Sequence, residues 1–325
     1  MDFRLDEQQL ELQDTVRRFC AARFPLERIA ERDARGVDPT AWREMAELGV
    51  FGLLEAGAGG GLGVVAGAIV FEQLGAHLVD GPALWSTLAA PCVDGAASGD
   101  RRIGGVERIG PGGEPILVEH APGIDALLIV RADGLFACAG PDLPCFDPLK
   151  PLDPLTPVAR CDALPRGTRV GDAGDAARLR VVGTVLTAAT LLGVASTALE
   201  TARRYALDRE QFGVPIGSFQ AVQHVLADMY VRTALARSAA YAAAAVLDDP
   251  EVGDPLRASA AAKLLAGEAA LENARAAIQV HGGVGFTWEM LPNYLLKRAW
   301  ALEHAFGDGE AHALSISDSI EEVLA

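Results

Sequence analysis

The chain has 325 residues, of which 28 are Lys or Arg and 44 are Asp or Glu, and half of all residues are apolar. This composition excludes a disordered chain and predicts about two packed domains, or one large domain with extra layers. The net charge of −16 and the lack of a Lys/Arg cluster argue against nonspecific nucleic-acid binding and against docking on an anionic membrane.

The N-terminal segment carries acidic side chains from Asp2 onward and no apolar run, which is not typical of a signal peptide. No apolar stretch is expected to approach the roughly 20 uncharged residues that span a bilayer. The five cysteines contain no CxxC pair and the six histidines no HExxH motif, so we expect reduced cysteines that serve as packing residues, and no metal site. These features predict a cytoplasmic protein without a membrane span.

The first ninety residues are expected to form an N-terminal helical domain, 1–90. Asp6 followed by Gln9 is a capping-box-like helix start. A short helix is predicted over 41–49 and another over 64–78, with the glycine-rich residues 56–63 as a connector. The apolar face of the short helix is predicted to consist of Trp42, Met45 and Leu48.

A reduced β domain is predicted over 91–172, where Gly, Pro and Asp are frequent and apolar runs are short. Residues 115–120 and 126–140 have the composition of strands. The second run is expected to fold into a hairpin at Asp133-Gly134.

A long helix is predicted over 175–208, and the turn residues 212–217 end it. Ser218 is expected to cap a second helix that runs to Asp248. The apolar positions of this second helix follow a 3,4,3 spacing. They are Phe219, Val222, Leu226 and Met229.

Two further helices are predicted in the C-terminal part of the chain. Asp254-Pro255 gives a helix N-cap with proline at the first helical position, and that helix is expected to end at Gly282-Gly283. A fourth helix is predicted near 289–305. The lengths of these helices imply a four-helix bundle, placed here at 173–325, so the fold class is mainly α with a small, sandwich-like or barrel β domain in the middle.

Residues 203–230 contain side chains that a connection between two helices does not require. A charged Arg-Glu-Gln triplet stands directly before Phe212 and a Gly/Pro turn. An arginine at a helix end is suited to hydrogen-bond a pyrophosphate, and a neighbouring ring can cover an aromatic ligand. The alternative is structural, with Arg209 in an inter-helix salt bridge and a packed phenylalanine.

Two glycine-rich segments also have competing interpretations. Gly282 and Gly283 allow the backbone to approach a ligand closely, or they are a plain helix C-cap. Residues 57–63 lack the Lys-Ser/Thr ending of a phosphate-binding loop and no strand precedes them, so a plain loop is predicted there.

Taken together, the motifs resemble a known family. REQFG followed by PIGSFQAVQHVLADM, and QVHGGVGFTWE followed by Leu-Pro and a helix, resemble the C-terminal bundle of the acyl-CoA dehydrogenases. WREMAELGVFGLLEAGAGGGLG and FEQLGAHL resemble the N-terminal helical domain of that family. The resemblance covers about residues 1–90 and 175–306, with the β segment between them in the expected order.

The resemblance implies an FAD site shared between subunits. By this resemblance Arg209 binds the pyrophosphate, Phe212 packs near the dinucleotide and Gln220 hydrogen-bonds it. It also implies that one further group meets the adenine end, consisting of Gln279, Val280, Gly282 and Gly283.

The departures from the family are as informative as the match. The family's Thr-Glu-Pro motif and the Trp-Ile-Thr or Trp-Ile-Ser strand of its β domain are missing from this sequence. The two positions at which the family places its catalytic glutamate align with Gly307 and with the neighbourhood of Gly183. Nearby carboxylates are Glu303, Asp308 and Glu310, which are expected to be solvated groups at a helix end. No catalytic residue is therefore assigned to this chain.

Abstraction of an α-proton beside a thioester requires a positioned base and an oriented flavin. A chain that keeps only the adenine-and-pyrophosphate half resembles the short subunit of the unequal pairs associated with steroid side-chain CoA-thioester breakdown. The resemblance implies a full-length dehydrogenase subunit as partner in an α2β2 assembly, an acyl-CoA substrate and an acceptor like electron-transfer flavoprotein. Two alternatives remain, a self-sufficient homo-oligomer with a relocated carboxylate and a degenerate scaffold without catalytic activity.

Overall fold

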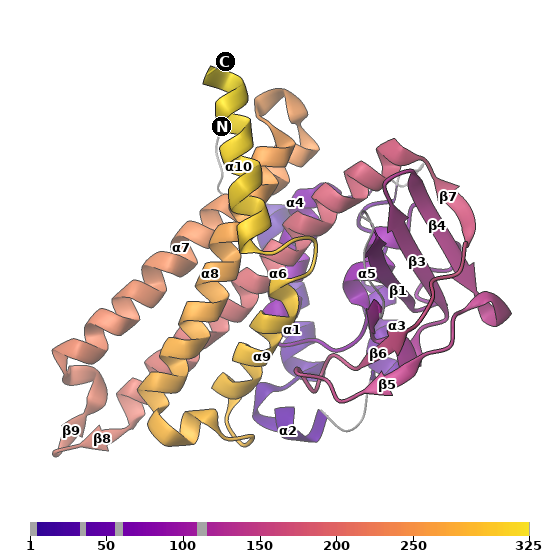
Figure 1. Ribbon diagram of the computed structural model, residues 1–325. Helices are drawn as coiled ribbons and strands as arrows, with labels where there is room; N and C mark the ends of the chain where they lie inside the picture. The colour runs from indigo at the N-terminus through magenta and orange to yellow at the C-terminus, as the bar shows by residue number, and fades with distance from the viewer. Residues whose placement is uncertain (1–4, 33–36, 56–60, 109–115, 325) are drawn as a thin grey trace. The chain divides into compact units, whose positions relative to one another are not determined.

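The computed structural model describes residues 5–32, 37–55, 61–108 and 116–324. The chain forms two compact units. The unit called here the bundle unit consists of Met1–Glu31, Ala68–Val79 and Thr184–Ala325, and the sheet unit consists of Arg32–Gly67 and Asp80–Gly183. The predicted fold class, mainly α with a small β region and a helical C-terminal part, is confirmed (Figure 1).

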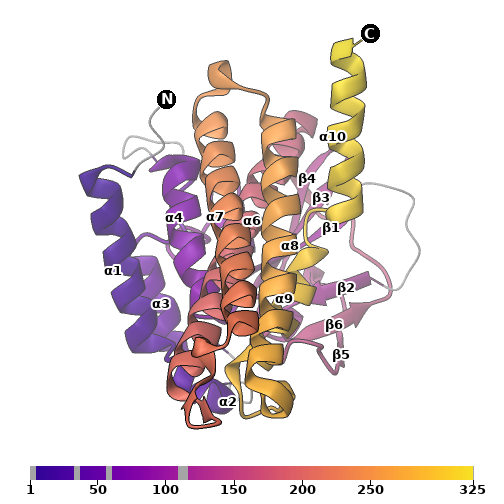
Figure 2. The ribbon, with the colours of Figure 1, turned by 90° about the vertical axis from the view of Figure 1, so that its left-hand side faces the viewer.

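Long helices dominate the bundle unit, and Figure 2 shows α7 and α8 side by side. The predicted 289–305 helix is slightly shorter in the structure, and a further C-terminal helix, α10, was not predicted. The helices are α1 (Glu7–Arg23), α4 (Gly63–Ala76), α6 (Ala173–Asp208), α7 (Gln220–Asp248), α8 (Pro255–His281), α9 (Leu291–Glu303) and α10 (Gly309–Leu324). The first residues of α4 (63–67) and of α6 (173–183) belong to the sheet unit. Short helical segments are η1 (Leu26–Arg28), α2 (Ile29–Arg32), η4 (Ile216–Ser218), η5 (Pro250–Val252) and η6 (Gly282–Phe286).

Side-chain caps are present at two of the predicted helix starts, those of α1 and α8, and the cap predicted for a third helix, α7, is absent. Asp6 and Gln9 form the predicted capping box, and Asp254 accepts hydrogen bonds from the first backbone amides of α8. The prediction that Ser218 caps α7 is wrong. Its hydroxyl donates to the Pro215 carbonyl instead, and Phe219 is the N-cap residue, without a side-chain cap.

The inward face of α7 is also only partly as predicted. Met229 is fully buried, whereas Val222 and Leu226 are half-buried and Phe219 is exposed. Most side chains in the first turns of α7 are exposed or half-buried. The apolar spacing therefore locates the helix correctly but overstates how much of it is buried.

The expectation about apolar stretches is wrong for α6. Residues 181–199 carry no charged side chain, and among the described helices of 18 residues or more α6 is apolar enough to cross a membrane. In the structure 78% of its apolar window is buried inside the protein. The core helix of a soluble bundle has the same composition, because all of its faces meet other helices.

The sheet unit contains two small sheets. One has the strand order β1-β3-β4-β7, with β1 parallel to β3, and the other has the order β2-β6-β5. Apolar side chains from both sheets form one core, as expected for a sandwich-like arrangement. The elements are α3 (Pro39–Glu47), α5 (Ala83–Ala89), β1 (Ile103–Arg108), β2 (Ile116–Glu119), β3 (Ala126–Arg131), β4 (Gly134–Ala139), β5 (Asp147–Leu149), β6 (Val158–Cys161) and β7 (Thr168–Gly171), with η2 (Ala121–Gly123) and η3 (Gly140–Asp142).

Predictions for the sheet unit are confirmed in outline and corrected in detail. The hairpin between β3 and β4 is present, but Arg131 pairs with Gly134, so its turn lies one residue earlier than predicted. Leu48 is exposed rather than part of the apolar face of α3. Of the glycine-rich connector, residues 56–60 lie outside the described residues, and Gly63 already belongs to α4.

None of the five cysteines, all of which lie in the described ranges, forms a disulfide. Three of them are buried packing residues, as predicted, whereas Cys92 is half-buried and Cys145 is exposed. Burial raises the pKa of Cys92 to about 11, so its thiol stays protonated at neutral pH.

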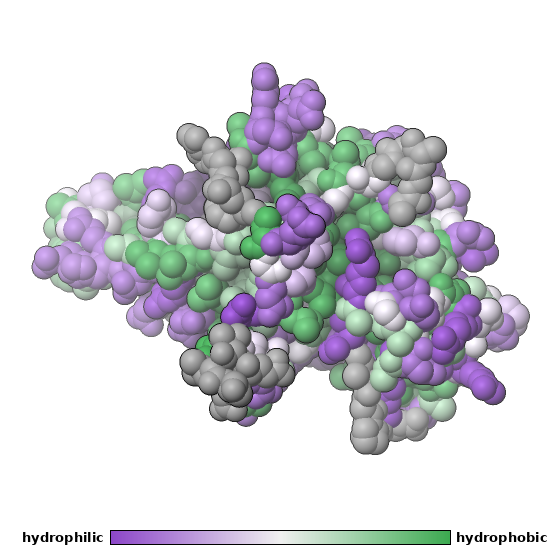
Figure 3. Space-filling model, turned by 90° about the horizontal axis from the view of Figure 1, so that it is seen from above, coloured by the Kyte–Doolittle hydropathy of each residue, from purple (hydrophilic) through white to green (hydrophobic). Residues whose placement is uncertain are grey.

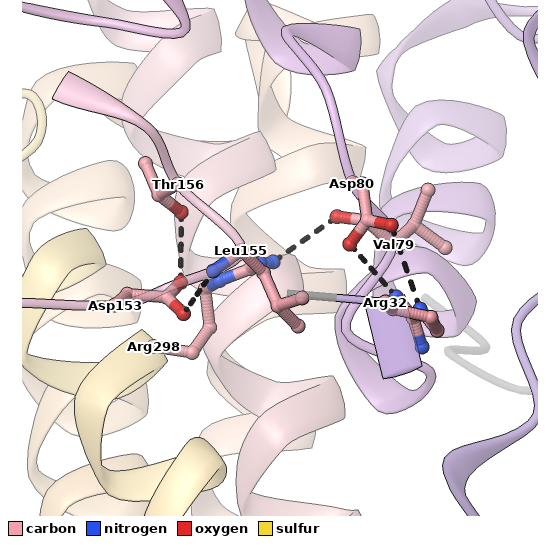
Figure 4. A network of polar contacts seen from close by, with 7 residues as sticks. All are labelled: Arg32, Val79, Asp80, Asp153, Leu155, Thr156 and Arg298. Carbon is pink, nitrogen blue, oxygen red and sulfur yellow. Dashed lines mark hydrogen bonds and ion pairs between the residues drawn. The ribbon is translucent and has the colours of Figure 1, made fainter. Parts of the chain in front are cut away.

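Within each unit, charged side chains near the Val79-Asp80 link are held by specific partners (Figure 4). In the sheet unit Arg32 forms an ion pair with Asp80 at 2.9 Å, and both side chains are largely buried. In the bundle unit the Arg298 guanidinium donates to the Val79 carbonyl at 3.1 Å. These bonds fix the backbone where the chain passes from one unit to the other.

Candidate functional site

The first predicted segment forms a tight hairpin after α6. Two-residue strands β8 (Glu210–Gln211) and β9 (Val214–Pro215) flank a turn whose central residues are Phe212 and Gly213. Both central residues have positive φ, +56° and +81°, as a type I′ hairpin turn requires. The Ile216 amide donates to the Arg209 carbonyl at 2.8 Å and closes the hairpin at its base.

Phe212 is the unusual residue of this turn. A non-glycine residue in the left-handed region costs about 1 kcal/mol or more, and the Phe212 side chain recovers little of this by packing because it is 94% exposed. Its ring makes a T-shaped contact with Phe219, with ring centroids 6.2 Å apart. The structural alternative of a packed phenylalanine therefore does not describe this chain.

Arg209 stands at the end of α6 with its side chain exposed. Its backbone amide still bonds to the Tyr205 carbonyl at 2.9 Å. Within the described part of the chain, no carboxylate forms an ion pair with its guanidinium. Arg203 and Arg204 differ, because both bind Glu200, and these hydrogen bonds lower the pKa of Glu200 to about 2. In the described ranges, Arg209 therefore does not form the inter-helix salt bridge of the structural alternative.

The second predicted segment begins where α8 ends. Gly282 is the C-cap of α8 with φ of +69°, so the C-cap interpretation is correct for this residue. A Cβ atom built on Gly282 or on Gly283 would have no heavy atom within 4 Å, so the space above this backbone is open. Gly285 differs, since a Cβ there would lie 2.8 Å from the Cβ of His281.

A stacked pair of rings joins the two segments. Tyr205, one turn before Arg209, stacks on His281, the residue before Gly282, with ring centroids 4.0 Å apart and planes inclined by 24°. His281 is also held by the Ala277 carbonyl, 2.7 Å from its Nδ1, and burial lowers its pKa, so the ring is neutral at pH 7. The β8–β9 hairpin and η6 lie at the same end of the bundle unit in Figure 1.

The remaining predicted residues lie near these two segments. Gln220 is the first residue of α7 and is exposed, as is Gln279 in the last turn of α8. Val280 is half-buried. The predicted residues therefore provide the Arg209 cation, two amide side chains, the Phe212 ring and open glycine backbone, which together can bind a ligand that has phosphates and a flat ring.

Sequence reasoning missed Tyr205 and His281. Both lie inside stretches that the sequence analysis singles out, Tyr205 in 203–230 and His281 in the QVHGG motif, but neither was given a role there. It also missed exposed aromatic side chains after Gly285: Phe286 is 63% exposed, and Trp288 carries the Lys297 ammonium 2.9 Å from its ring centre. Figure 3, which views the molecule from above, shows patches of hydrophobic residues among hydrophilic ones on that face.

The carboxylates near the expected base position are engaged in the turn between α9 and α10. Oε1 of Glu303 accepts a hydrogen bond from the Gly309 amide at 2.9 Å, and Oδ1 of Asp308 caps α10 at the Ala311 amide, also at 2.9 Å. Glu310 is exposed in the first turn of α10. These bonds give Glu303 and Asp308 structural tasks at a helix start.

Gly307, at one of the two expected base positions, has φ of +96°, a conformation that L side chains rarely adopt. A Cβ there would lie 3.1 Å from Nε2 of His312. The buried Lys263 ammonium donates to the Gly307 carbonyl at 2.8 Å and to the Glu303 carbonyl at 2.7 Å, and so fixes this turn. The local backbone is built around a glycine rather than around a glutamate.

Comparison with known proteins agrees with the fold and with the motifs. The acyl-CoA dehydrogenase N-terminal domain model matches residues 6–97, and the acyl-CoA dehydrogenase C-terminal domain model matches residues 181–321. The chain is 33% identical over 291 residues to the acyl-CoA dehydrogenase IpdE2 of Mycobacterium tuberculosis, with 84% of each chain covered.

Solved structures show the same architecture. A chain of the ChsE4-ChsE5 complex from Mycobacterium tuberculosis matches with a TM-score of 0.86 and 26% identity, covering 99% of both chains. Butyryl-CoA dehydrogenase from Megasphaera elsdenii shares the fold with a TM-score of 0.82 at 19% identity, over 98% of this chain and 100% of that one. Matching models over both helical regions, together with a relative of this identity and coverage, show that the chain belongs to the acyl-CoA dehydrogenase family.

Proposed function

We propose that this chain is the short subunit of a hetero-oligomeric, FAD-dependent acyl-CoA dehydrogenase, in which a full-length partner supplies the catalytic glutamate. The observation that carries the proposal is the pairing of Arg209, which has no carboxylate partner in the described chain, with the exposed Phe212 at the tip of a strained turn. Neither Arg209 nor the exposed Phe212 ring contributes much to the stability of the isolated chain. Both are explained when a ligand and a second subunit cover this end of the bundle.

The donor set fits a dinucleotide. Arg209 would hold the pyrophosphate by charge-assisted hydrogen bonds, and Phe212 would cover part of the dinucleotide. Gln220 would hydrogen-bond the dinucleotide, while Gln279 and the backbone of Val280, Gly282 and Gly283 would meet its adenine end. The open space above both glycines leaves room for a ring to approach the backbone.

The reaction proposed for the complex is α,β-dehydrogenation of a CoA thioester, with a steroid side-chain thioester as the substrate class. The α-proton goes to the partner's carboxylate, and the product is the enoyl thioester. The chemistry that FAD supplies when bound is acceptance of the hydride from the β-carbon. An acceptor like electron-transfer flavoprotein then takes the electrons, and the proposed location is the cytoplasm.

Support for a half-site comes from the turn at Gly307. The left-handed backbone there disfavours a glutamate, and Glu303 and Asp308 already bind backbone amides. A general base must reach within about 3 Å of the proton that it removes, directly or through one water. Neither carboxylate can move toward a substrate without losing its structural bond.

The test is co-expression with a full-length dehydrogenase encoded beside this chain, followed by co-purification and a flavin-to-chain ratio from the absorbance spectrum. Arg209→Ala should weaken flavin retention by about 1.5 to 3 kcal/mol, which is roughly tenfold to more than a hundredfold, while the assembly survives. The matched control is Arg204→Ala, which removes an exposed arginine that Glu200 already neutralises. This control should keep its flavin.

Three other results would contradict the proposal. Equal flavin content in the Arg209→Ala and wild-type complexes would remove Arg209 from the site. Flavin binding and turnover by this chain without a partner would favour the self-sufficient homo-oligomer. A chain that binds neither flavin nor a dehydrogenase subunit would be a scaffold.

A further inference from the structure

The stacked rings of Tyr205 and His281 lie just before two exposed segments of the bundle unit. Every residue from 207 to 215 is exposed, and this segment is called here the hairpin arm. Residues 282–289 are called the glycine arm, and Gly285 is the one buried residue among them. Exposed segments have few packing contacts of their own that fix their position.

Each arm carries residues of the proposed flavin site. Arg209 and Phe212 belong to the hairpin arm. Gly282 and Gly283 belong to the glycine arm. A ligand that contacts both arms binds more tightly when the arms already stand at the right separation, because ordering them on binding costs entropy. The affinity for flavin therefore depends on what joins the two arms.

Tyr205 is connected to the hairpin arm through the last turn of α6. The Arg209 amide donates to the Tyr205 carbonyl at 2.9 Å, and the Arg209 carbonyl accepts from the Ile216 amide at 2.8 Å. Ala206, next to Tyr205, is buried, and a Cβ built on Gly217 would lie 2.9 Å from the Ala206 carbonyl oxygen. Both ends of the hairpin arm are thus tied to the turn of α6 that carries the Tyr205 ring.

His281 anchors the glycine arm in a similar way. The residue is 6% exposed, and its Nδ1 lies 2.7 Å from the Ala277 carbonyl, one turn earlier in α8. A Cβ on Gly285 would lie 2.8 Å from the Cβ of His281, so the buried glycine of the arm packs directly on this side chain. The glycine arm therefore takes its position from His281.

The stack links these two anchor residues, with ring centroids 4.0 Å apart. Further back in the bundle unit, the Asn273 amide of α8 donates to the Ala195 carbonyl of α6 at 3.3 Å. Along the helix axes this bond lies about 12 Å from His281 and about 15 Å from Tyr205. The stack acts at the helix ends themselves, where the two arms begin.

We propose that Tyr205 and His281 are positioning residues of the flavin site, and that their stack holds Arg209 at the separation from the glycine arm that a bound dinucleotide needs. The inference rests on the proposed function, because it concerns the same site. Neither ring contacts the flavin in this proposal, and each acts through the arm that follows it. A stack that served the fold alone would affect the melting temperature but not the affinity for flavin.

The first test is the flavin dissociation constant of the complex with a full-length subunit, measured by titrating FAD into complex that has been depleted of it. Tyr205→Ala and His281→Ala should each raise this constant about three- to tenfold, as expected from the interaction energy of an aromatic pair. Tyr205→Phe and His281→Phe keep two stacked rings and should stay within about twofold of wild type. The matched control is Leu207→Ala, which removes a 56% exposed side chain of the same turn and should leave the constant unchanged.

The second test is a double-mutant cycle, which separates positioning from stability. If the stack acts by placing Arg209, then Tyr205→Ala should raise the dissociation constant less than about twofold in a chain that already carries Arg209→Ala. Circular dichroism melting shows whether each variant is folded at the temperature of the titration. Tyr205→Leu keeps an apolar side chain without a ring, should weaken flavin binding as Tyr205→Ala does, and takes its place if the alanine variant does not fold.

The outcomes distinguish this inference from the proposed function. Equal effects of Tyr205→Ala in the wild-type and Arg209→Ala backgrounds would overturn the positioning role. A complex that loses flavin in Arg209→Ala, but binds it equally well in wild type and in Tyr205→Ala, would overturn the positioning role and leave the proposed function standing. A wild-type complex that binds no flavin would overturn both.

Discussion

Glu303, Asp308 and Glu310 show how a titratable residue near an expected catalytic position can have another task. Glu303 and Asp308 each accept a hydrogen bond from a backbone amide at the start of α10. Such bonds need an oxygen acceptor but not a negative charge. Amide variants therefore separate the two possible roles, because Gln and Asn keep the acceptor and lose the base.

We expect Glu303→Gln, Asp308→Asn and Glu310→Gln each to leave turnover of the complex within about threefold of wild type, because loss of a true general base costs roughly a hundredfold or more. Steady-state turnover with acyl-CoA, together with flavin content, measures this. Replacement of the partner's glutamate serves as the control and should abolish dehydrogenation with flavin still bound. A hundredfold loss in one of the three amide variants, with FAD retained, would mean that this chain has its own active site.

The contact between α4 and α6 within the bundle unit depends on two glycines. A Cβ on Gly75 would lie 2.0 Å from the Thr190 carbonyl oxygen, and a Cβ on Gly193 would lie 2.1 Å from the Glu72 carbonyl oxygen. The two helices therefore touch backbone to backbone at both points. The Thr197 hydroxyl, which donates to the Ala76 carbonyl at 2.8 Å, adds a hydrogen bond to this crossing.

Gly75→Ala or Gly193→Ala should lower the free energy of unfolding by at least about 1 to 3 kcal/mol, because the added methyl group forces the helices apart. Gly267→Ala in α8 is the matched control, since a Cβ there meets no heavy atom within 4 Å. In that variant the gain in helix propensity should raise stability by up to about 1 kcal/mol. Urea denaturation followed by circular dichroism measures all three, and an equal effect of Gly75→Ala and Gly267→Ala would contradict the close crossing.

At the scale of the whole molecule, the buried imidazole of His281 and the half-buried imidazole of His312 make the free energy of unfolding depend on pH. Burial lowers the pKa of His281 and of His312 below the ordinary value of 6.5, and the Lys263 charge further opposes protonation of His312. The folded chain therefore binds fewer protons than the unfolded chain near this pH. The contribution that the two neutral imidazoles make to the free energy of unfolding is therefore complete above about pH 6.5, and it is lost as the pH falls below this value.

The melting temperature should accordingly decrease as the pH is lowered from about 7.5 to about 5.5. His312→Gln should flatten this slope, because its amide can still donate to the Phe306 carbonyl, as Nε2 of His312 does at 3.0 Å, but does not titrate. Identical slopes for wild type and His312→Gln would contradict the linkage.

The sequence by itself determined the features that depend on neighbouring residues. The capping box at Asp6, the proline start of α8 after Asp254 and the hairpin in the β region all follow from side chains within a few positions of one another. The two motif segments around Arg209 and Gly282 were found in the same way. Ser218 failed as a cap because a local signal was overridden by the fold of the preceding hairpin.

Only the tertiary structure decided how these segments meet and which side chains remain free to bind. The stack of Tyr205 on His281 joins two segments that are more than seventy residues apart, and the parallel pairing of β1 with β3 likewise has no signature in either strand. Whether Arg209 is paired depends on which carboxylates the fold brings near it, and whether Phe212 is buried depends on what packs over the hairpin. The pairing of Arg209 and the burial of Phe212 both depend on contacts with residues far away in the sequence. A linear pattern therefore predicts which residues are candidates for binding, but not what surrounds them in the fold.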